Sequence, residues 1–311
     1  MRVVVIGDSN VDLEIRLPSG PRPDTHANPD PQMFGGGSAA NTAAALARLG
    51  VPCRFVGAVG DDGFGRFAVE SLAQAGVDTS AIAKTAESPT VAVIAVVQPD
   101  GDRLIYVWPP QGGAHAALEP RSTVAAIRGA AWLHVSGICL RVAPARYALL
   151  EAMKRARSDG IPVSFDLNLR LENWGWDSGF AEAVEAAIDH SDVVLGAASD
   201  EIGAIADIAD PTAAAASLVG ERRVVVARMG ADGAVACSPT ETVSVSGFAV
   251  PVVDTVGAGD AFNAGFIAAR LRDLGLRDAV EWGNAVAGLT IAGPGARSTP
   301  VLSDVEALLD R

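Results

Sequence analysis

Residues 254–266 read Asp254-Thr255-Val256-Gly257-Ala258-Gly259-Asp260-Ala261-Phe262-Asn263-Ala264-Gly265-Phe266 and connect β-type residues to an apolar, alanine-rich helix. A Gly-Ala-Gly turn at the start of a helix leaves backbone N–H groups unpaired and unobstructed. The helix dipole adds positive potential at the same end. The segment therefore predicts a binding site for an anion such as a phosphate group.

Asp260 lies one residue beyond this turn. Phosphoryl transfer needs an anion hole for the transferring group and a carboxylate within reach of the attacking hydroxyl, and Asp260 is placed for the second task. On this segment alone the alternative is a tight strand-to-helix turn in which Asp260 caps the helix. No Lys-Ser/Thr pair follows the glycines, so the segment is not a P-loop.

A second glycine-rich segment lies near the N-terminus, where Phe34-Gly35-Gly36-Gly37-Ser38-Ala39-Ala40-Asn41 leads into a helical pattern that stops at Gly50. Three glycines let a ligand approach the main chain closely, and Asn41 can both donate and accept hydrogen bonds. These properties suit a ligand with many hydroxyl groups. The alternative is a flexible hinge with Asn41 satisfied inside the protein.

Strand-like apolar runs alternate with alanine- and leucine-rich helical patterns along the chain. The predicted strands are residues 3–6, 54–59, 132–135, 163–166 and 193–195, and the predicted helices are 39–49, 64–75, 146–158, 181–187 and 211–216. This alternation predicts an α/β fold with a doubly wound, mostly parallel sheet between helices.

Two stretches lack helical patterns: residues 13–35, and residues 90–109, where two β-type runs flank the turn Pro99-Asp100-Gly101-Asp102. They predict a small β-sheet lid over the carboxyl edge of the main sheet, where ligands bind in open α/β folds. A thin β-layer rarely persists alone in water, so we expect a homodimer through the lid. The α/β core, with the nucleotide and substrate sites, then comprises residues 1–12, 36–89 and 110–311.

The composition limits the functional classes. The chain has 311 residues, of which 49% are hydrophobic, so it can form a large buried sheet. Its net charge of −13 disfavours a nucleic-acid partner. The longest apolar stretch, residues 91–97, is far shorter than the ~20 residues that span a bilayer, and no signal peptide is recognisable, so no membrane partner is expected. Cys53, Cys139 and Cys237 lie among apolar residues, which is typical of free thiols in a reducing cytoplasm.

Taken together, Gly36-Gly37-x-x-x-Asn41 and Asp254-Thr-Val-Gly-Ala-Gly-Asp260 resemble the two signature segments of the ribokinase-like, or PfkB, carbohydrate kinases. The resemblance covers nearly the whole chain through residues 7–12, 56–65, 76–78, 230–234 and 294–296 with Pro300. It implies a ribokinase-like fold and ATP-dependent phosphorylation of a hydroxyl on a small sugar or sugar acid of the fructose, 2-keto-3-deoxygluconate or ribose type. It also implies ATP, Mg²⁺ and K⁺ as cofactors.

The resemblance assigns roles by position. Asp260 would be the catalytic base, with anion-hole amides from Gly257, Ala258 and Gly259. The sugar site would be lined by Asn10, Asp12, Gly36, Gly37 and Asn41. The nucleotide would lie beside Arg228, Gly230, Gly233 and, at the adenine, Asn284. Asp254, with main-chain carbonyls around Val256 and in residues 293–298, is similar to the family's monovalent-cation site. For Arg228 the alternative is a strand-end arginine in solvent.

A further segment, Ser164-Phe165-Asp166-Leu167-Asn168-Leu169-Arg170, resembles the Phe-Asp-x-Asn-x-Arg segment of 2-keto-3-deoxygluconate kinases and fructokinases. It adds Asp166, Asn168 and Arg170 to the expected substrate-binding residues. The Arg170 guanidinium can bind a sugar-acid carboxylate or an ATP phosphate in a bidentate manner. The alternative is a surface ion pair with Glu172 or Asp177.

One segment departs from the family pattern. Relatives carry an Asn-x-x-Glu segment that organises magnesium-bound water, whereas residues 195–201 of this chain lack the asparagine. Glu201 could still act on magnesium through water, because Mg²⁺ keeps most of its hydration shell. The departure leaves a non-catalytic sugar-binding sensor as an alternative of another class, although the intact Asp260 argues against it.

Two other functions are alternatives to a sugar kinase. A nucleoside kinase of the same fold is favoured if the lid buries an aromatic side chain against a base, with Phe34, Tyr106 and Trp108 as candidates. A nicotinamide oxidoreductase is excluded, because Gly7-Asp8-Ser9-Asn10 lacks the G-x-G-x-x-G that follows the first strand in such enzymes.

Overall fold

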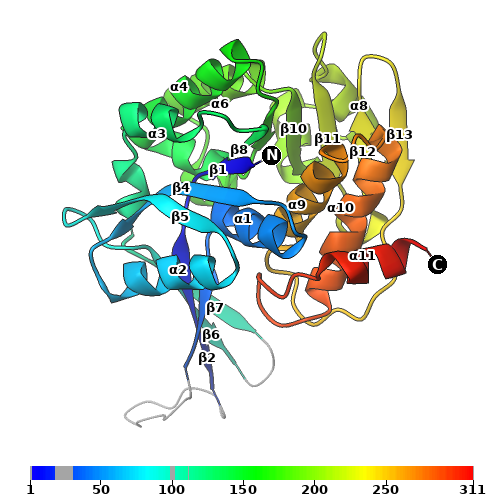
Figure 1. Ribbon diagram of the computed structural model, residues 1–311. Helices are drawn as coiled ribbons and strands as arrows, with labels where there is room; N and C mark the ends of the chain where they lie inside the picture. Colours follow the sequence, from blue (N-terminus) through cyan, green and yellow to red (C-terminus); the bar gives the residue numbers. More distant parts are fainter. Residues whose placement is uncertain (1, 18–30, 99–101, 111, 311) are drawn as a thin grey trace.

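A nine-stranded sheet forms the centre of the computed structural model, which describes residues 2–17, 31–98, 102–110 and 112–310 (Figure 1). The strand order is β13-β12-β11-β10-β9-β8-β1-β4-β5, and all neighbours from β11 to β5 are parallel, whereas β12 and β13 are antiparallel. The strands are β1 (Val3–Ile6), β4 (Cys53–Gly60), β5 (Asp78–Thr85), β8 (Trp132–Ser136), β9 (Val163–Asp166), β10 (Val193–Ala197), β11 (Val224–Arg228), β12 (Ala234–Cys237) and β13 (Thr242–Val245). The predicted doubly wound, mostly parallel sheet is confirmed.

Helices cover both faces of this sheet, and each predicted helix overlaps an observed one. Because side chains of a strand alternate between faces, Val4 and Ile6 of β1 join one apolar core while Val3 and Val5 join the other. On the first face lie α3 (Pro120–Ala126), α4 (Ala145–Ser158), α6 (Ser178–Asp189) and α8 (Pro211–Ser217). On the second face lie α1 (Ser38–Arg48), α9 (Ala258–Arg270), α10 (Leu276–Ile291) and α11 (Leu302–Leu309). The other α-helices of the described residues are α2 (Gly63–Gln74) and the short α5 (Leu171–Trp174) and α7 (Ala204–Ala206).

A small second sheet projects from the main sheet (Figure 1). Its order is β3-β2-β6-β7, with β2 (Asn10–Arg16) antiparallel to β3 (Gln32–Gly36) and parallel to β6 (Ala92–Val97), and with β7 (Arg103–Trp108) antiparallel to β6. The predicted small β-layer is thus present, although residues 18–30 and most of the turn predicted at 99–102 lie outside the described residues. Asn10, Asp12 and Gly36 belong to strands of this sheet. The division into core and lid stays a prediction.

Close contact between α9 and α10 fixes the position of the first turn of α9. A Cβ atom on Gly265 would lie 2.6 Å from the carbonyl oxygen of Trp282, and one on Gly283 would lie 2.7 Å from the ring of Phe262. Both glycines therefore allow the two helices to approach more closely than larger residues would permit. The first turn of α9 lies at the end of β11, because Arg228, the last residue of that strand, donates to the Gly259 carbonyl.

The cysteines and the lengths of the helices are two further features of the fold. Cys53, Cys139 and Cys237 are buried and unpaired, as predicted. Across the described parts of the chain, every helix is too short or too polar to cross a bilayer.

Asp62 joins α2 to the segment that leads into β6. Its Oδ1 accepts hydrogen bonds from the Gly65 amide (2.7 Å) and the Thr90 hydroxyl (2.9 Å), and its Oδ2 accepts one from the Thr90 amide (2.8 Å). Burial raises the pKa of Asp62, but these hydrogen bonds outweigh it and hold the pKa below its usual value. We expect Asp62→Ala to lower the free energy of unfolding by about 3 kcal/mol at pH 7, measured by urea denaturation.

Asp210 provides the matched control, because it caps α8 through a single bond from the Ala213 amide (2.7 Å). Asp210→Ala should cost about 1 kcal/mol. Since the pKa of Asp62 is lowered, the extra cost of Asp62→Ala should disappear as the pH falls through that pKa. Equal costs for the two variants at pH 7 would show that the Thr90 bonds do not stabilise the fold.

Candidate active site

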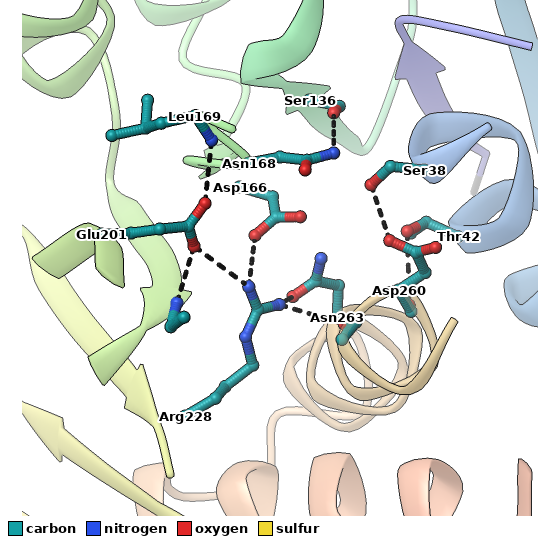
Figure 2. A network of polar contacts seen from close by, with 12 residues as sticks. Ser38, Thr42, Ser136, Asp166, Asn168, Leu169, Glu201, Arg228, Asp260 and Asn263 are labelled. Carbon is teal, nitrogen blue, oxygen red and sulfur yellow. Dashed lines mark hydrogen bonds and ion pairs between the residues drawn. The ribbon is translucent and has the colours of Figure 1, made fainter. Parts of the chain in front are cut away.

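Asp260 lies where α1 and α9 both begin, and its carboxylate faces α1 (Figure 2). Its Oδ1 accepts a hydrogen bond from the Ser38 hydroxyl at 2.6 Å, and its Oδ2 accepts one from the Asn41 amide nitrogen at 3.0 Å. The Thr42 hydroxyl donates to the main-chain carbonyl of Asp260 at 3.2 Å. Gly257 is the N-cap residue of α9, so the alternative in which Asp260 caps its own helix is wrong.

Burial controls the protonation of Asp260. It raises the pKa of this carboxyl from 3.8 to about 7, and the nearby carboxylates of Asp166 and Asp8 add to the effect. Hydrogen bonds from Ser38 and Asn41 act in the opposite direction, because they stabilise the charged form. A carboxyl group with a pKa near 7 can accept a proton and release it again at neutral pH.

The first turns of the two helices differ in how their amides are used. At the start of α1, the Asp8 carboxylate accepts hydrogen bonds from the Ser38 amide (3.0 Å) and the Ala39 amide (3.2 Å). At the start of α9, no such carboxylate contact is found among the described residues, and the N-cap residue Gly257 adopts a left-handed conformation with φ of 80°. The start of α9, not that of α1, therefore offers amides to an anion.

Within the predicted anion hole, the three residues contribute differently. The Ala258 amide donates to the Thr255 carbonyl at a long 3.3 Å. Gly259 is the second residue of α9, so helix geometry leaves its amide without a carbonyl one turn earlier. Gly257 must remain a glycine, because a Cβ would lie 2.7 Å from that of Ala296. The role of this turn as an anion hole stays a prediction.

The predicted sugar-binding residues form one group beside Asp260. The Asn10 amide nitrogen donates to Asp12 Oδ1 at 2.7 Å, and a Cβ on Gly36 would lie 2.5 Å from Asp12 Oδ2. Gly37 has φ of 96°, and a Cβ there would lie 2.7 Å from the Asp8 carbonyl oxygen. These glycines make room for neighbouring protein atoms, whereas the sequence suggested a close approach by a ligand.

Asn41 is engaged within the protein at both ends of its side chain. Its nitrogen donates to Asp260, and its Oδ1 accepts a hydrogen bond from Arg297 Nε at 3.1 Å. The alternative considered from the sequence, an internally satisfied Asn41, thus describes its contacts in this structure. Sequence reasoning noted residues 293–298 only for their carbonyls and missed Arg297, although it directly follows the recognised Pro294-Gly295-Ala296.

Arg297 also affects the protonation of the sugar-binding group. Burial raises the pKa of Asp12 to about 6, and the positive charge of Arg297 opposes that rise. The pKa of Arg297 itself is lowered to about 10 by burial, while Asp12 and Asp260 act to raise it. Arg297 therefore remains charged at neutral pH between two carboxyl groups.

Arg228 is the centre of a buried ionic network (Figure 2). Its Nη2 donates to Asp166 Oδ1 at 2.7 Å, and its Nη1 donates to Asn263 Oδ1 at 2.8 Å and to the Gly259 carbonyl at 3.1 Å. Glu201 Oε2 lies 3.8 Å from Nη2. Burial lowers the pKa of Arg228, but Asp166 and Glu201 outweigh it and raise the pKa. With a side chain only 16% exposed, Arg228 is not a solvated strand-end arginine, and that alternative is wrong.

Glu201 uses both of its oxygens within the protein. Oε1 accepts a hydrogen bond from the Leu169 amide (2.8 Å) and Oε2 one from the Ala197 amide (2.7 Å). Burial is the main cause that raises its pKa. These contacts do not fit a direct magnesium ligand. Within the described residues, no three His, Cys, Asp or Glu side chains are grouped in a way that could hold a metal ion.

Asp254 connects the two segments that the cation-site prediction requires. Its Oδ1 accepts a hydrogen bond from the Val256 amide at 3.2 Å, and its Oδ2 accepts one from the Gly295 amide at 3.1 Å. The carboxylate thus brings residues 254–256 and 293–298 together, which fits a monovalent cation held by carbonyls of both segments.

The other predicted nucleotide-binding residues lie at the β12 and β13 end of the sheet. Gly230 has φ of 61° and open space around it, whereas a Cβ on Gly233 would lie 2.1 Å from the Val245 carbonyl oxygen. The Asn284 amide nitrogen donates to the carbonyls of Val245 (3.0 Å) and Ser246 (3.2 Å). Gly233 and Asn284 therefore have packing roles that would suffice to explain them.

The predicted substrate-binding residues in and after β9 differ in their burial. Asp166 and Asn168 are buried, and the Asn168 amide nitrogen donates to the Ser136 hydroxyl at 3.3 Å. Arg170 instead is exposed and is the N-cap residue of α5, with φ of 50°. Asp177, one of its alternative partners, forms an ion pair with Arg141 at 2.9 Å. Arg170 is therefore exposed to solvent, unlike the buried group around Asp260.

Loss of Arg228 should destabilise the protein strongly. Arg228→Met leaves Asp166 and Glu201 as buried acids without their cation, and we expect a cost of about 4 kcal/mol in the free energy of unfolding. Arg223 is the matched control, since its ion pair with Asp189 (3.1 Å) involves a carboxylate whose side chain is 77% exposed. Arg223→Met should cost about 1 kcal/mol.

Urea denaturation of both variants and of Arg228→Met/Asp166→Asn measures these costs. The double variant should regain part of the lost stability, because it removes one of the two uncompensated charges. An Arg228→Met cost no larger than that of Arg223→Met would contradict the ionic network as a stabilising feature.

Comparison with known proteins gives a consistent result. Residues 1–302 match the family model described as pfkB family carbohydrate kinase. The chain is 35% identical to an ATP-dependent ribose-1-phosphate kinase of Halopiger xanaduensis, over 99% of this chain and 98% of the relative. It is 33% identical to a 5-dehydro-2-deoxygluconokinase of Geobacillus thermodenitrificans, over 87% and 82% of the two chains.

A solved structure is similar over almost the full length. It is a fructokinase double mutant of Vibrio cholerae in a form with bound fructose, ADP and potassium ion. The TM-score is 0.78 at 30% identity, with 99% of this chain and 98% of that chain covered. The arrangement of the two sheets and their helices is therefore shared with a known carbohydrate kinase.

Proposed function

Because the chain belongs to the pfkB family of carbohydrate kinases, we infer that it is an ATP-dependent sugar kinase, and we propose Asp260 as its catalytic base. The observation that carries this proposal is that the Asp260 carboxyl is buried beside the N-terminus of α9 and has a pKa of about 7. A sensor without activity has no need for a buried carboxyl poised to exchange a proton. The kinase is therefore favoured over the sensor.

Each group of residues in the site has its own role in the proposed reaction. Asp260 accepts the proton of the acceptor hydroxyl while the oxygen of that hydroxyl attacks the γ-phosphorus and the bond to the β-phosphate oxygen breaks. The amides of Gly257, Ala258 and Gly259 stabilise the negative charge on the transferring group. Bound ATP supplies this group and bound Mg²⁺ offsets its charge. Because Glu201 is engaged by amides, we propose that Mg²⁺ is held mainly by phosphates and water.

The acceptor is proposed to be a sugar or sugar derivative bound by Asn10, Asp12 and the glycine segment before α1. Asp12 can accept hydrogen bonds from hydroxyl groups with the lone pairs that Asn10 leaves free. The named relatives act on a neutral sugar, a sugar phosphate and a sugar acid. For an acceptor that carries a phosphate or a carboxylate, the exposed Arg170 is the proposed contact of that group. Tyr106 and Trp108 are half exposed, so they do not favour a nucleoside.

Other proposals concern the surroundings of the site. The position of Asp254 between two loop segments supports a K⁺ ion there, which would fix the anion-hole turn. The buried free thiols suit a reducing compartment and support a cytoplasmic location. ATP and nucleotide contacts remain proposed for Arg228, Gly230, Gly233 and Asn284, with Arg228 acting through the Gly259 carbonyl.

Substitution of Asp260 tests the base. We expect ATP consumption that depends on an added acceptor, in a screen of fructose, ribose, ribose 1-phosphate, 5-dehydro-2-deoxygluconate, inosine and adenosine. Asp260→Asn should lower kcat about 1000-fold. In the wild type, kcat should rise with pH and level off above about pH 7, because the base must be ionised. Retention of wild-type kcat by Asp260→Asn rules out this mechanism, and thermal stabilisation by a sugar without turnover indicates a sensor.

The same substitution has an expected effect on stability. The raised pKa means that the folded protein binds this proton more tightly than the unfolded chain, so the wild type loses stability as the pH rises from about 4 to about 7. Asp260→Asn lacks this loss. The difference in free energy of unfolding, variant minus wild type, should therefore grow over that range, and a constant difference would mean that Asp260 titrates normally.

The small sheet supports a homodimer. Residues Leu104, Ile105, Tyr106, Val107 and Trp108 of its edge strand β7 are all exposed, which leaves an apolar strand and its backbone groups open to pairing. We expect a dimer of the wild type by sedimentation equilibrium and a monomer of Ile105→Glu. Arg121→Glu on α3 is the control that changes charge elsewhere, and a monomeric wild type would refute the proposal.

A further inference from the structure

We propose that Arg297 is a positioning residue that orients the Asn41 carboxamide and, through it, the carboxylate of Asp260, while holding the end of β3 in place. The inference rests on the proposed function, in which Asp260 is the base. It gives a role to a residue that neither the sequence motifs nor the mechanism had used.

The chemistry of the arginine decides which way Asn41 faces. A guanidinium group only donates hydrogen bonds, so the Asn41 atom that faces Arg297 Nε at 3.1 Å must be the oxygen. The nitrogen of the same carboxamide then faces Asp260 Oδ2 at 3.0 Å and donates to it. With the carboxamide reversed, two oxygens would meet at Asp260 and two donors would meet at Arg297. Arg297 thus selects the orientation that holds the base.

The guanidinium joins three elements at once. Besides Asn41 on α1, its Nη1 donates to the Ser71 hydroxyl on α2 at 2.7 Å, and its Nη2 donates to the Gly36 carbonyl at the end of β3 at 3.1 Å. A Cβ on Gly35 would lie 2.1 Å from Nη1, so this glycine leaves the space that the guanidinium fills. A lysine has one point of donation and cannot make this set of contacts.

The charge of Arg297 acts on the same group of residues. The carboxyl groups of Asp12 and Asp260 both interact with it and act to raise its pKa. Asp260 also faces the carboxylates of Asp8 and Asp166, and it raises the pKa of Arg228. Substitution of Arg297 leaves those three groups in place. Removal of its charge and of the Asn41 contact should therefore both raise the pKa of Asp260.

Two variants separate geometry from charge. Arg297→Ala should lower kcat about 100-fold and move the acid limb of the kcat profile to higher pH. Arg297→Lys keeps the charge, so its acid limb should stay close to that of the wild type while kcat falls about tenfold. Millimolar guanidinium should restore part of kcat in Arg297→Ala, because the ion fits the space left by the side chain.

Arg48 is the matched control. Its Nε donates to the Thr299 carbonyl at 2.8 Å, so it also connects α1 to the C-terminal loop, but its contact is with neither Asn41 nor Asp260. Arg48→Ala should leave kcat and its pH profile unchanged and show no response to guanidinium. Circular dichroism and thermal melting establish that each variant is folded.

The outcomes separate this inference from the proposed function. A wild type without acceptor-dependent ATP consumption refutes the function. An active wild type with a folded Arg297→Ala of unchanged kcat and pH profile refutes only the positioning role, as does equal behaviour of Arg297→Ala and Arg48→Ala. If Arg297→Ala does not fold, Arg297→Lys decides, because wild-type kcat in that variant also refutes the role.

Discussion

A carboxyl group buried between the starts of two helices is the constraint around which this protein is arranged. Burial disfavours the ionised form of Asp260 and raises its pKa to about 7. The Ser38 hydroxyl and the Asn41 carboxamide limit that cost by donating to its two oxygens. The surrounding structure serves to hold these donors in place, since a displaced donor would leave an uncompensated buried charge.

Two arginines support this carboxyl group from different directions. Arg228 contacts the Gly259 carbonyl in the first turn of α9 and binds Asp166, so it connects that turn to the end of β9. Arg297 contacts Asn41 in the first turn of α1 and the last carbonyl of β3. One arginine therefore supports the start of α9 and the other the start of α1. Both use the guanidinium fork, which several fixed acceptors can occupy at once.

The sequence predicted much of the site because its signals are local. A glycine turn before an apolar helix identified residues 257–260, and alternating apolar runs identified the parallel strands whose ends meet there. Contacts across the chain were not predictable in this way. Arg297 lies 256 positions from Asn41, and Arg228 lies 62 positions from Asp166. No local pattern marks either arginine as buried, and Arg228 looked equally like a strand end in solvent.

The sequence by itself determined the alternation of strands and helices from β1 to β10, the glycine turn at residues 257–259 and the candidate base, because short-range periodicity and glycine conformations dictate those features. It did not identify β5, β11, β12 or β13. Only the tertiary structure showed which neighbouring atoms require a glycine at each position. Gly36 and Gly37 admit Asp12 and the Asp8 carbonyl, and Gly233 admits the Val245 carbonyl. It also decided that Asp260 faces α1 and not its own helix, because that orientation depends on how α1 and α9 pack together on one face of the sheet.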